Sequence, residues 1–146
     1  MASSAASASP SPETGIEDEV SLFRLYVLRA MYGVLVVGLG AMIVPVILDH
    51  ELTSRGVIPS LLGAVWLLAF LGLRYPLAML PLLLFELAWK AIWMLAFGLP
   101  QWSAGQYPPT FAEDSFNIAF GAVLLFVIPW GYVWRNYVQR PGARWR

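Results

Sequence analysis

The chain has 146 residues, of which 59% are hydrophobic and only 12% are charged, and this balance excludes an ordinary soluble domain. The formal net charge is zero, so we expect no general attraction to polyanions and no nucleic-acid partner. The lack of cysteine excludes disulfides and thiolate chemistry, and with a single histidine as well we expect neither a metal site nor a cofactor.

Residues 1–20 are rich in Ala, Ser and Pro and end in an acidic run. This segment has no apolar stretch that could join a core, so it is predicted to be a disordered acidic tail. It also lacks the basic and apolar regions of a secretory signal, and no cleavage is expected. The folded part is predicted to be one transmembrane domain, residues 21–138, followed by a basic tail at residues 139–146.

Four apolar segments follow the tail, and each can cross a hydrocarbon core of ~30 Å as a helix that rises ~1.5 Å per residue, the second only just. They are residues 22–48, 57–73, 76–99 and 116–134. The turn at Tyr75 and Pro76 makes the second and third segments an antiparallel hairpin. The predicted fold is therefore all-α, with four transmembrane helices in an antiparallel bundle.

Several residues predict local features at the ends of these spans. Pro45 is expected to kink or break the far end of the first span. Thr110 and Glu113 have the spacing of a capping box, which predicts a helical turn ahead of the fourth span. Pro129 and Gly131 are expected to bend the end of that span.

Basic residues mark one side of the membrane. Arginines flank the first span, separate the second from the third, and follow the fourth: Arg24, Arg29, Arg74, Arg135, Arg140, Arg144 and Arg146. The positive-inside rule therefore places both termini in the cytoplasm. The last four arginines are expected to lie against anionic headgroups, at about 1 kcal/mol for each basic residue near the surface.

Glu86 and Lys90 stand near the middle of the third predicted span. Four residues apart, with the acid first, they share one helix face in the more favourable order. A charge at the bilayer centre costs roughly 2.5–3.5 kcal/mol on insertion scales, so neither side chain is expected to face lipid. We expect them to point into the bundle or a wet cavity, as an ion pair or as a protonated acid beside a neutral amine.

Two interpretations of this pair follow from the residues. A buried pair can fix the packing and register of the helices, or it can serve as a proton relay or a polar ligand site. Trp89 and Trp93 are the aromatic neighbours expected to support it. Arg29 in the first span is expected either to snorkel toward the headgroups or to turn inward and meet Glu86.

Motifs for common catalytic chemistry are absent from the sequence. The run of residues 49–51, Asp-His-Glu, is too compact to surround a metal ion, and we expect it to be a solvated link. The acidic residues of the two external links, Asp49, Glu51, Glu113 and Asp114, are likewise expected to be solvated. We assign no catalytic residue and do not expect an enzyme.

The run GLRYPLAMLPLLLFELAWKAIWMLAFGLPQW, residues 72–102, resembles a stretch in a family of small four-span bacterial inner-membrane proteins whose function is not established. The run covers about a fifth of the chain. The resemblance implies a bacterial inner-membrane location, and it implies that Glu86, Trp89, Lys90 and Trp93 form one unit. It implies no activity.

Two functions are therefore expected from the sequence. The first is a structural or accessory membrane subunit in which the Glu86–Lys90 pair fixes helix packing or docks a partner. The second is a small carrier of protons or a polar solute, with Glu86 as the titrating group. The expected partners are the lipid bilayer and either another membrane protein or a second copy of the chain.

Overall fold

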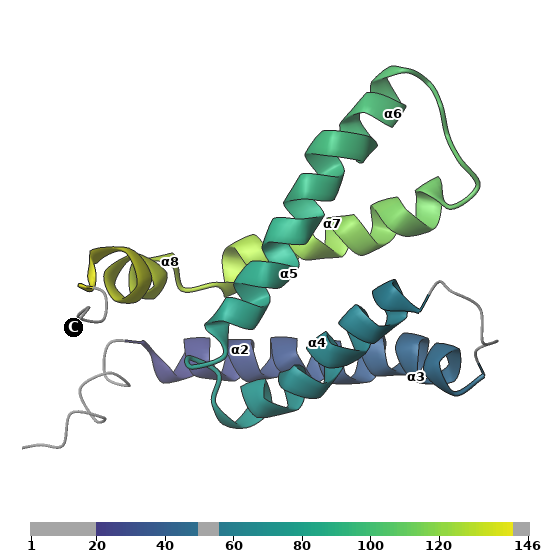
Figure 1. Cartoon of the computed structure of the whole chain (residues 1–146). Helices are drawn as coiled ribbons and strands as arrows, with labels where there is room; N and C mark the ends of the chain where they lie inside the picture. Colours follow the sequence, from purple (N-terminus) through teal and green to yellow (C-terminus); the bar gives the residue numbers. More distant parts are fainter. Residues whose placement is uncertain (1–19, 50–55, 142–146) are drawn as a thin grey trace, which may run out of the picture.

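The computed structural model describes residues 20–49 and 56–141, and every regular element in these two ranges is helical (Figure 1). Two long helices each contain a π-helical turn, one is regular, and the last is broken. Their segments are α2 (Leu22–Val34), η1 (Leu35–Leu39), α3 (Gly40–Leu48), α4 (Val57–Arg74), α5 (Leu80–Trp93), η2 (Met94–Gly98), α6 (Leu99–Ser103), α7 (Phe111–Val127), α8 (Trp130–Val133) and η3 (Trp134–Gln139).

Successive long helices run in roughly opposite directions, as Figure 1 shows. The continuous helix α2–η1–α3 packs along α4, and α5 packs against α7. The two hairpins join through contacts of α2 with α7 and of α4 with α5. The beginning of α2, the turn between α4 and α5, and α8 all lie at one end of the molecule (Figure 1).

Three of these helices are long and apolar enough to cross a membrane, namely Leu22–Leu48, Val57–Arg74 and Leu80–Ser103. A fourth span exists if α7 and the segment Trp130–Gln139 are taken together, although they are bent by 73° at their break. The predicted all-helical fold is confirmed for the described residues, and three to four of their helices are candidates for the four predicted spans. The chain has the helices of a multi-pass membrane protein.

The third span begins and ends four residues later than the predicted 76–99. Pro76 opens a turn in which Met79 N donates to Tyr75 O at 3.1 Å, and the helix proper starts at Leu80. Pro81 then occupies the first helical turn, where a missing N–H costs nothing. The sequence offered two prolines for the start of this helix, and the prediction chose the wrong one.

The fourth span departs most from the prediction of residues 116–134. The helical turn predicted ahead of this span is present, because α7 starts at Phe111 with Thr110 as its N-cap residue. The Thr110 side chain makes no capping hydrogen bond, however, so the predicted capping box does not form. The helix ends at Val127, and Ile128 takes an extended conformation with ψ of 125°. Pro129 forces that conformation on the residue before it, so the expected bend is a full break.

The first span matches its predicted bounds, and the helix continues through Pro45 to Leu48. Its irregular part lies earlier, at the π-helical turn η1. There the Trp66 indole of α4 donates from Nε1 to the Val36 carbonyl at 2.8 Å. Gly40 makes room for this contact, because a methyl group in its place would overlap the indole nitrogen.

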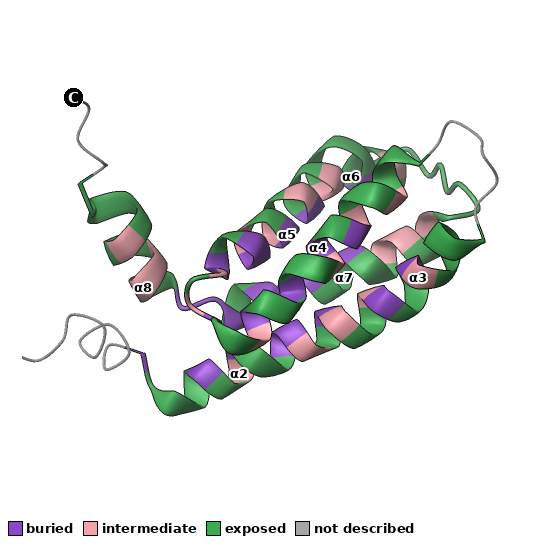
Figure 2. Ribbon diagram, turned by 60° about the horizontal axis from the view of Figure 1, so that its bottom comes forward, coloured by how far each residue is buried: buried purple, intermediate pink, exposed green. Residues whose placement is uncertain are grey.

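The core is a thin apolar layer between the helices, as the inward-facing buried residues in Figure 2 show. Tyr32 lies at its centre, 0% exposed, with its ring against Gly72 of α4 and its hydroxyl donating to Pro76 O at 3.3 Å. Large apolar side chains cover the outside, and Phe126 and Phe23 are 83% and 78% exposed. Such a surface suits a lipid environment and would be unusual in water.

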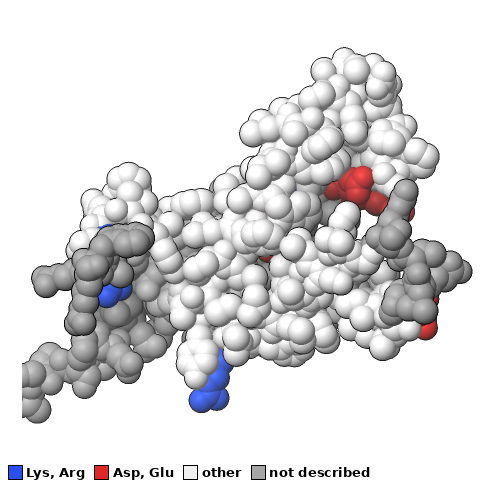
Figure 3. All heavy atoms as spheres, viewed as in Figure 1, with Lys and Arg blue, Asp and Glu red and all other residues white. Residues whose placement is uncertain are grey.

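Apart from the buried Glu86 and Lys90, the charged residues of the described ranges lie toward opposite ends of the molecule (Figure 3). Arg24 and Arg29 lie in the first part of α2, and Arg74 ends α4. Acidic residues lie at the other end, where Asp49 follows α3 and Glu113 and Asp114 occupy the first turn of α7. The end that carries the arginines is the one that the positive-inside rule predicts to be cytoplasmic.

Candidate functional site

Glu86 and Lys90 form a buried ion pair on α5, in which Lys90 Nζ donates to Glu86 Oε2. The two residues are only 3% and 8% exposed. Because the helix runs from Leu80 to Ser103, Lys90 lies near its middle, while Glu86 lies about 9 Å from its first residue. The pair is therefore about one helical turn closer to the arginine end than the predicted span implied.

The aliphatic part of Lys90 crosses α7 at Gly121. A methyl group on Gly121 would overlap Lys90 Cδ, and it would approach Cε and Cγ to 3.3 and 3.4 Å. Glycine at this position therefore allows α5 and α7 to approach with the lysine stem between them. The contact fixes the direction of the ammonium group, which turns back along α5 toward Glu86.

Trp89 contacts the pair on the same helix. Its ring lies under Lys90 Nζ, with 4.0 Å between the nitrogen and the ring centroid, a cation–π distance. The ammonium group is therefore held by a carboxylate and by an aromatic face.

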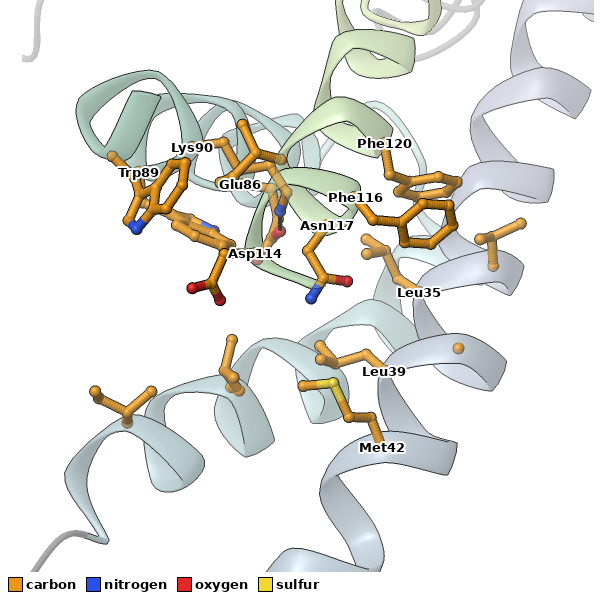
Figure 4. A pocket seen from close by; sticks show the side chains of 16 residues that line it. Leu35, Leu39, Met42, Glu86, Trp89, Lys90, Asp114, Phe116, Asn117 and Phe120 are labelled. Atoms are coloured by element: carbon orange, nitrogen blue, oxygen red, sulfur yellow. Dashed lines mark hydrogen bonds and ion pairs between the residues drawn. The ribbon is translucent and has the colours of Figure 1, made fainter. Parts of the chain in front are cut away.

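A cavity of about 660 Å³ lies beside the pair. Figure 4 shows it between α7 and α5 on one side and α2, α3 and α4 on the other. Most of its wall is apolar, and its polar part consists of Glu86, Lys90, Asp114, Asn117 and the indoles of Trp89 and Trp93. Met42 and Ile58 line it near the acidic end of the molecule.

Asp114 and Asn117 project from α7 into this cavity (Figure 4). Asp114 lies about 10 Å along the helix from Gly121, the residue that Lys90 crosses. The sequence interpretation placed Asp114 in a solvated link and did not single out Asn117. Their signal is the spacing of residues 114, 117 and 121, which puts both polar groups on the helix face of Gly121.

Within the part of the chain that the structure describes, two buried polar side-chain atoms of residues lining the cavity have no hydrogen-bond partner. Glu86 Oε1 is an acceptor without a donor, and Trp89 Nε1 is a donor without an acceptor. Both residues line the cavity. A buried group without a partner costs about 1–3 kcal/mol, so a molecule that satisfied these atoms would gain that free energy.

Of the other two residues predicted to support the pair, Trp93 lies at the cavity and Arg29 does not. Trp93 lines the cavity, and it lies over Gly98, where a methyl group would come within 2.7 Å of its ring. Arg29 is exposed on α2, with its guanidinium 5.8 Å from the centroid of the Tyr26 ring. Arg29 therefore does not turn inward to meet Glu86, which is paired with Lys90 instead.

The arginines predicted to lie at the membrane surface are only partly within the described ranges. Arg135 lies in η3 and Arg140 follows it, and both are exposed. Arg144 and Arg146 fall outside the described residues. At the same end of the molecule, Arg24 donates from Nη2 to the Ile128 carbonyl at 3.3 Å, which ties the start of α2 to the break after α7.

Comparisons with known proteins do not extend this description, since no family model, curated protein or solved structure matches the chain.

Proposed function

We propose that this chain is a multi-pass protein of the bacterial inner membrane that binds a small amphipathic molecule beside the Glu86–Lys90 pair, as a small carrier would. The observation that carries the proposal is the cavity of about 660 Å³ with two unpartnered buried polar atoms in its wall. Ligand sites commonly have this form, a mostly apolar hollow with a few placed polar groups. Glu86 is the polar anchor in this proposal.

Charge and position support this function for Glu86. Its Oε2 is held by Lys90, whereas its Oε1 has no partner. An intramembrane carboxylate with an open oxygen is the kind of group that marks ligand and proton pathways in membrane proteins. Glu86 and Asp114 both line the cavity, so one hollow joins the neighbourhood of Glu86 to the first turn of α7.

A second function, that of an accessory subunit, is favoured by the contact between Lys90 and Gly121. That contact joins α5 to α7 through the charged residue itself, so the pair contributes to helix packing whether or not a ligand binds. In this role the partner is another membrane protein or a second copy of the chain, docked on the exposed apolar faces.

Native mass spectrometry of the protein extracted with its surrounding lipid tests the proposal. We expect the wild type to retain a small molecule or lipid in stoichiometric amount, and the Glu86→Gln variant to lose it while keeping its helical content. Glu113→Gln is the matched control, because it makes the same change on α7 at a residue that does not line this cavity.

Two results would contradict the ligand function. The first is equal retention by the wild type and Glu86→Gln, which would remove Glu86 as the anchor. The second is a wild type that carries no small molecule but a stoichiometric protein partner, which would establish the accessory role instead.

A further inference from the structure

We infer that the molecule accepted by this cavity is a lipophilic monocation, an apolar body that carries one positive charge. This inference rests on the proposed ligand function and adds the charge of the ligand to it. It is carried by the acidic and basic groups that line the cavity, and by which of their atoms are already paired.

Counted over the described residues, the cavity wall holds two carboxylates and one ammonium group, from Glu86, Asp114 and Lys90. Lys90 balances one of the two carboxylates, because its Nζ is bound to Glu86 Oε2. One negative charge in the wall is then left without a cationic partner from the wall itself. The arginines of the described ranges lie toward the opposite end and do not line the cavity.

Among the described residues of this wall, an anionic ligand meets no free cation. Lys90 Nζ is already covered by the Glu86 carboxylate on one side and the Trp89 ring on the other. Displacing Glu86 from it would leave a buried carboxylate unpaired, which is strongly unfavourable. An anion is therefore rejected by the same pair that a cation would complement.

A positive ligand complements the cavity in two places. Its charge can lie beside Asp114, in the field of the Glu86 carboxylate, whose residue is only 3% exposed and whose Oε1 has no hydrogen-bond partner. Its apolar body can lie against Leu39, Met42 and Trp93. In a wall of low dielectric, attraction between opposite charges is several times stronger than in water.

The test compares three probes of similar shape and different charge: tetraphenylphosphonium, tetraphenylborate and the neutral triphenylphosphine oxide. Each is titrated into the full-length protein in lipid nanodiscs, and binding to empty nanodiscs of the same composition is subtracted. We expect the phosphonium to bind about tenfold more tightly than either other probe. Binding of the phosphonium should weaken as ionic strength rises, but less than for an exposed pair.

Two variants locate the charge. Asp114→Asn is expected to weaken phosphonium binding about fivefold and to leave the neutral probe unchanged. Glu113→Gln removes the same charge from the adjacent residue, which does not belong to the wall of this cavity, and should change binding less than about twofold. If Asp114→Asn is poorly folded, Asp114→Glu keeps the charge and should restore the preference for the cation.

Failure of this inference is distinguishable from failure of the proposed function. Equal or tighter binding of the neutral probe would overturn the cationic ligand and keep a ligand cavity. Tighter binding of the borate would overturn it too. Absence of binding by all three probes would also overturn it, while the retained-molecule measurement on Glu86→Gln would decide the proposed function independently.

Discussion

Replacement of Gly121 by alanine tests how α5 and α7 are held together. The added methyl group would overlap Lys90 Cδ, and the lysine is held in place because its residue is only 8% exposed and its ammonium group is bound to Glu86. Overpacking of this kind costs about 1–3 kcal/mol. If the lysine instead leaves its site, Glu86 loses its partner, and breaking a buried pair costs about 3–5 kcal/mol. We therefore expect Gly121→Ala to destabilise the protein by at least about 1 kcal/mol.

Unfolding in mixed micelles, followed by the fluorescence of the seven tryptophans, measures this cost. The matched control is Gly131→Ala, because a methyl group on Gly131 would meet no atom within 4 Å. Alanine has the higher helix propensity, so this control should be neutral or stabilising by up to about 1 kcal/mol. The comparison separates the contact with Lys90 from the general effect of adding a methyl group.

A double-mutant cycle assigns the cost to the lysine stem. In the background Glu86→Gln with Lys90→Ala, the stem is gone, and Gly121→Ala should cost less than about 0.5 kcal/mol. An unchanged cost in that background would show that the methyl group meets something other than Lys90. A cost equal to that of Gly131→Ala in the wild-type background would refute the reasoning altogether.

Two further contacts yield predictions for the same unfolding assay. Trp66→Phe removes the indole donor to Val36 O, and we expect a loss of about 1 kcal/mol, whereas an unchanged midpoint would show that the bond contributes nothing. Gly72→Ala should cost about 1–3 kcal/mol, because its methyl group would overlap the Tyr32 ring, which is fully buried and cannot move aside. Gly33→Ala is its control, with an ordinary contact at 3.9 Å, and an equal effect of the two would contradict this account.

The features that could be predicted are those set by short stretches of sequence. The length of the apolar runs predicts the helices, and the four-residue spacing of Glu86 and Lys90 predicts their ion pair on one helix face. Both depend only on helix geometry. They would hold in many arrangements of the same helices.

The features that could not be predicted depend on which helices meet. That Lys90 crosses Gly121 requires the register between α5 and α7, which no local pattern supplies. Asp114 was interpreted as a link residue because the apolar run starts near residue 116, yet α7 begins at Phe111. Acidic residues favour the first turn of a helix, so Glu113 and Asp114 were a signal for this earlier start.

The structural and ligand interpretations of the pair are compatible, because they use different atoms of it. Lys90 joins α5 to α7 through its aliphatic stem, and its ammonium group donates a hydrogen bond to Glu86 Oε2. This arrangement holds the carboxylate in one orientation and leaves Oε1 at the cavity without a partner. Packing of the lysine thus positions the open oxygen that a ligand would use. Gly121→Ala, which displaces the lysine stem, should then weaken ligand binding and lower stability together. Asp114→Asn should weaken ligand binding alone.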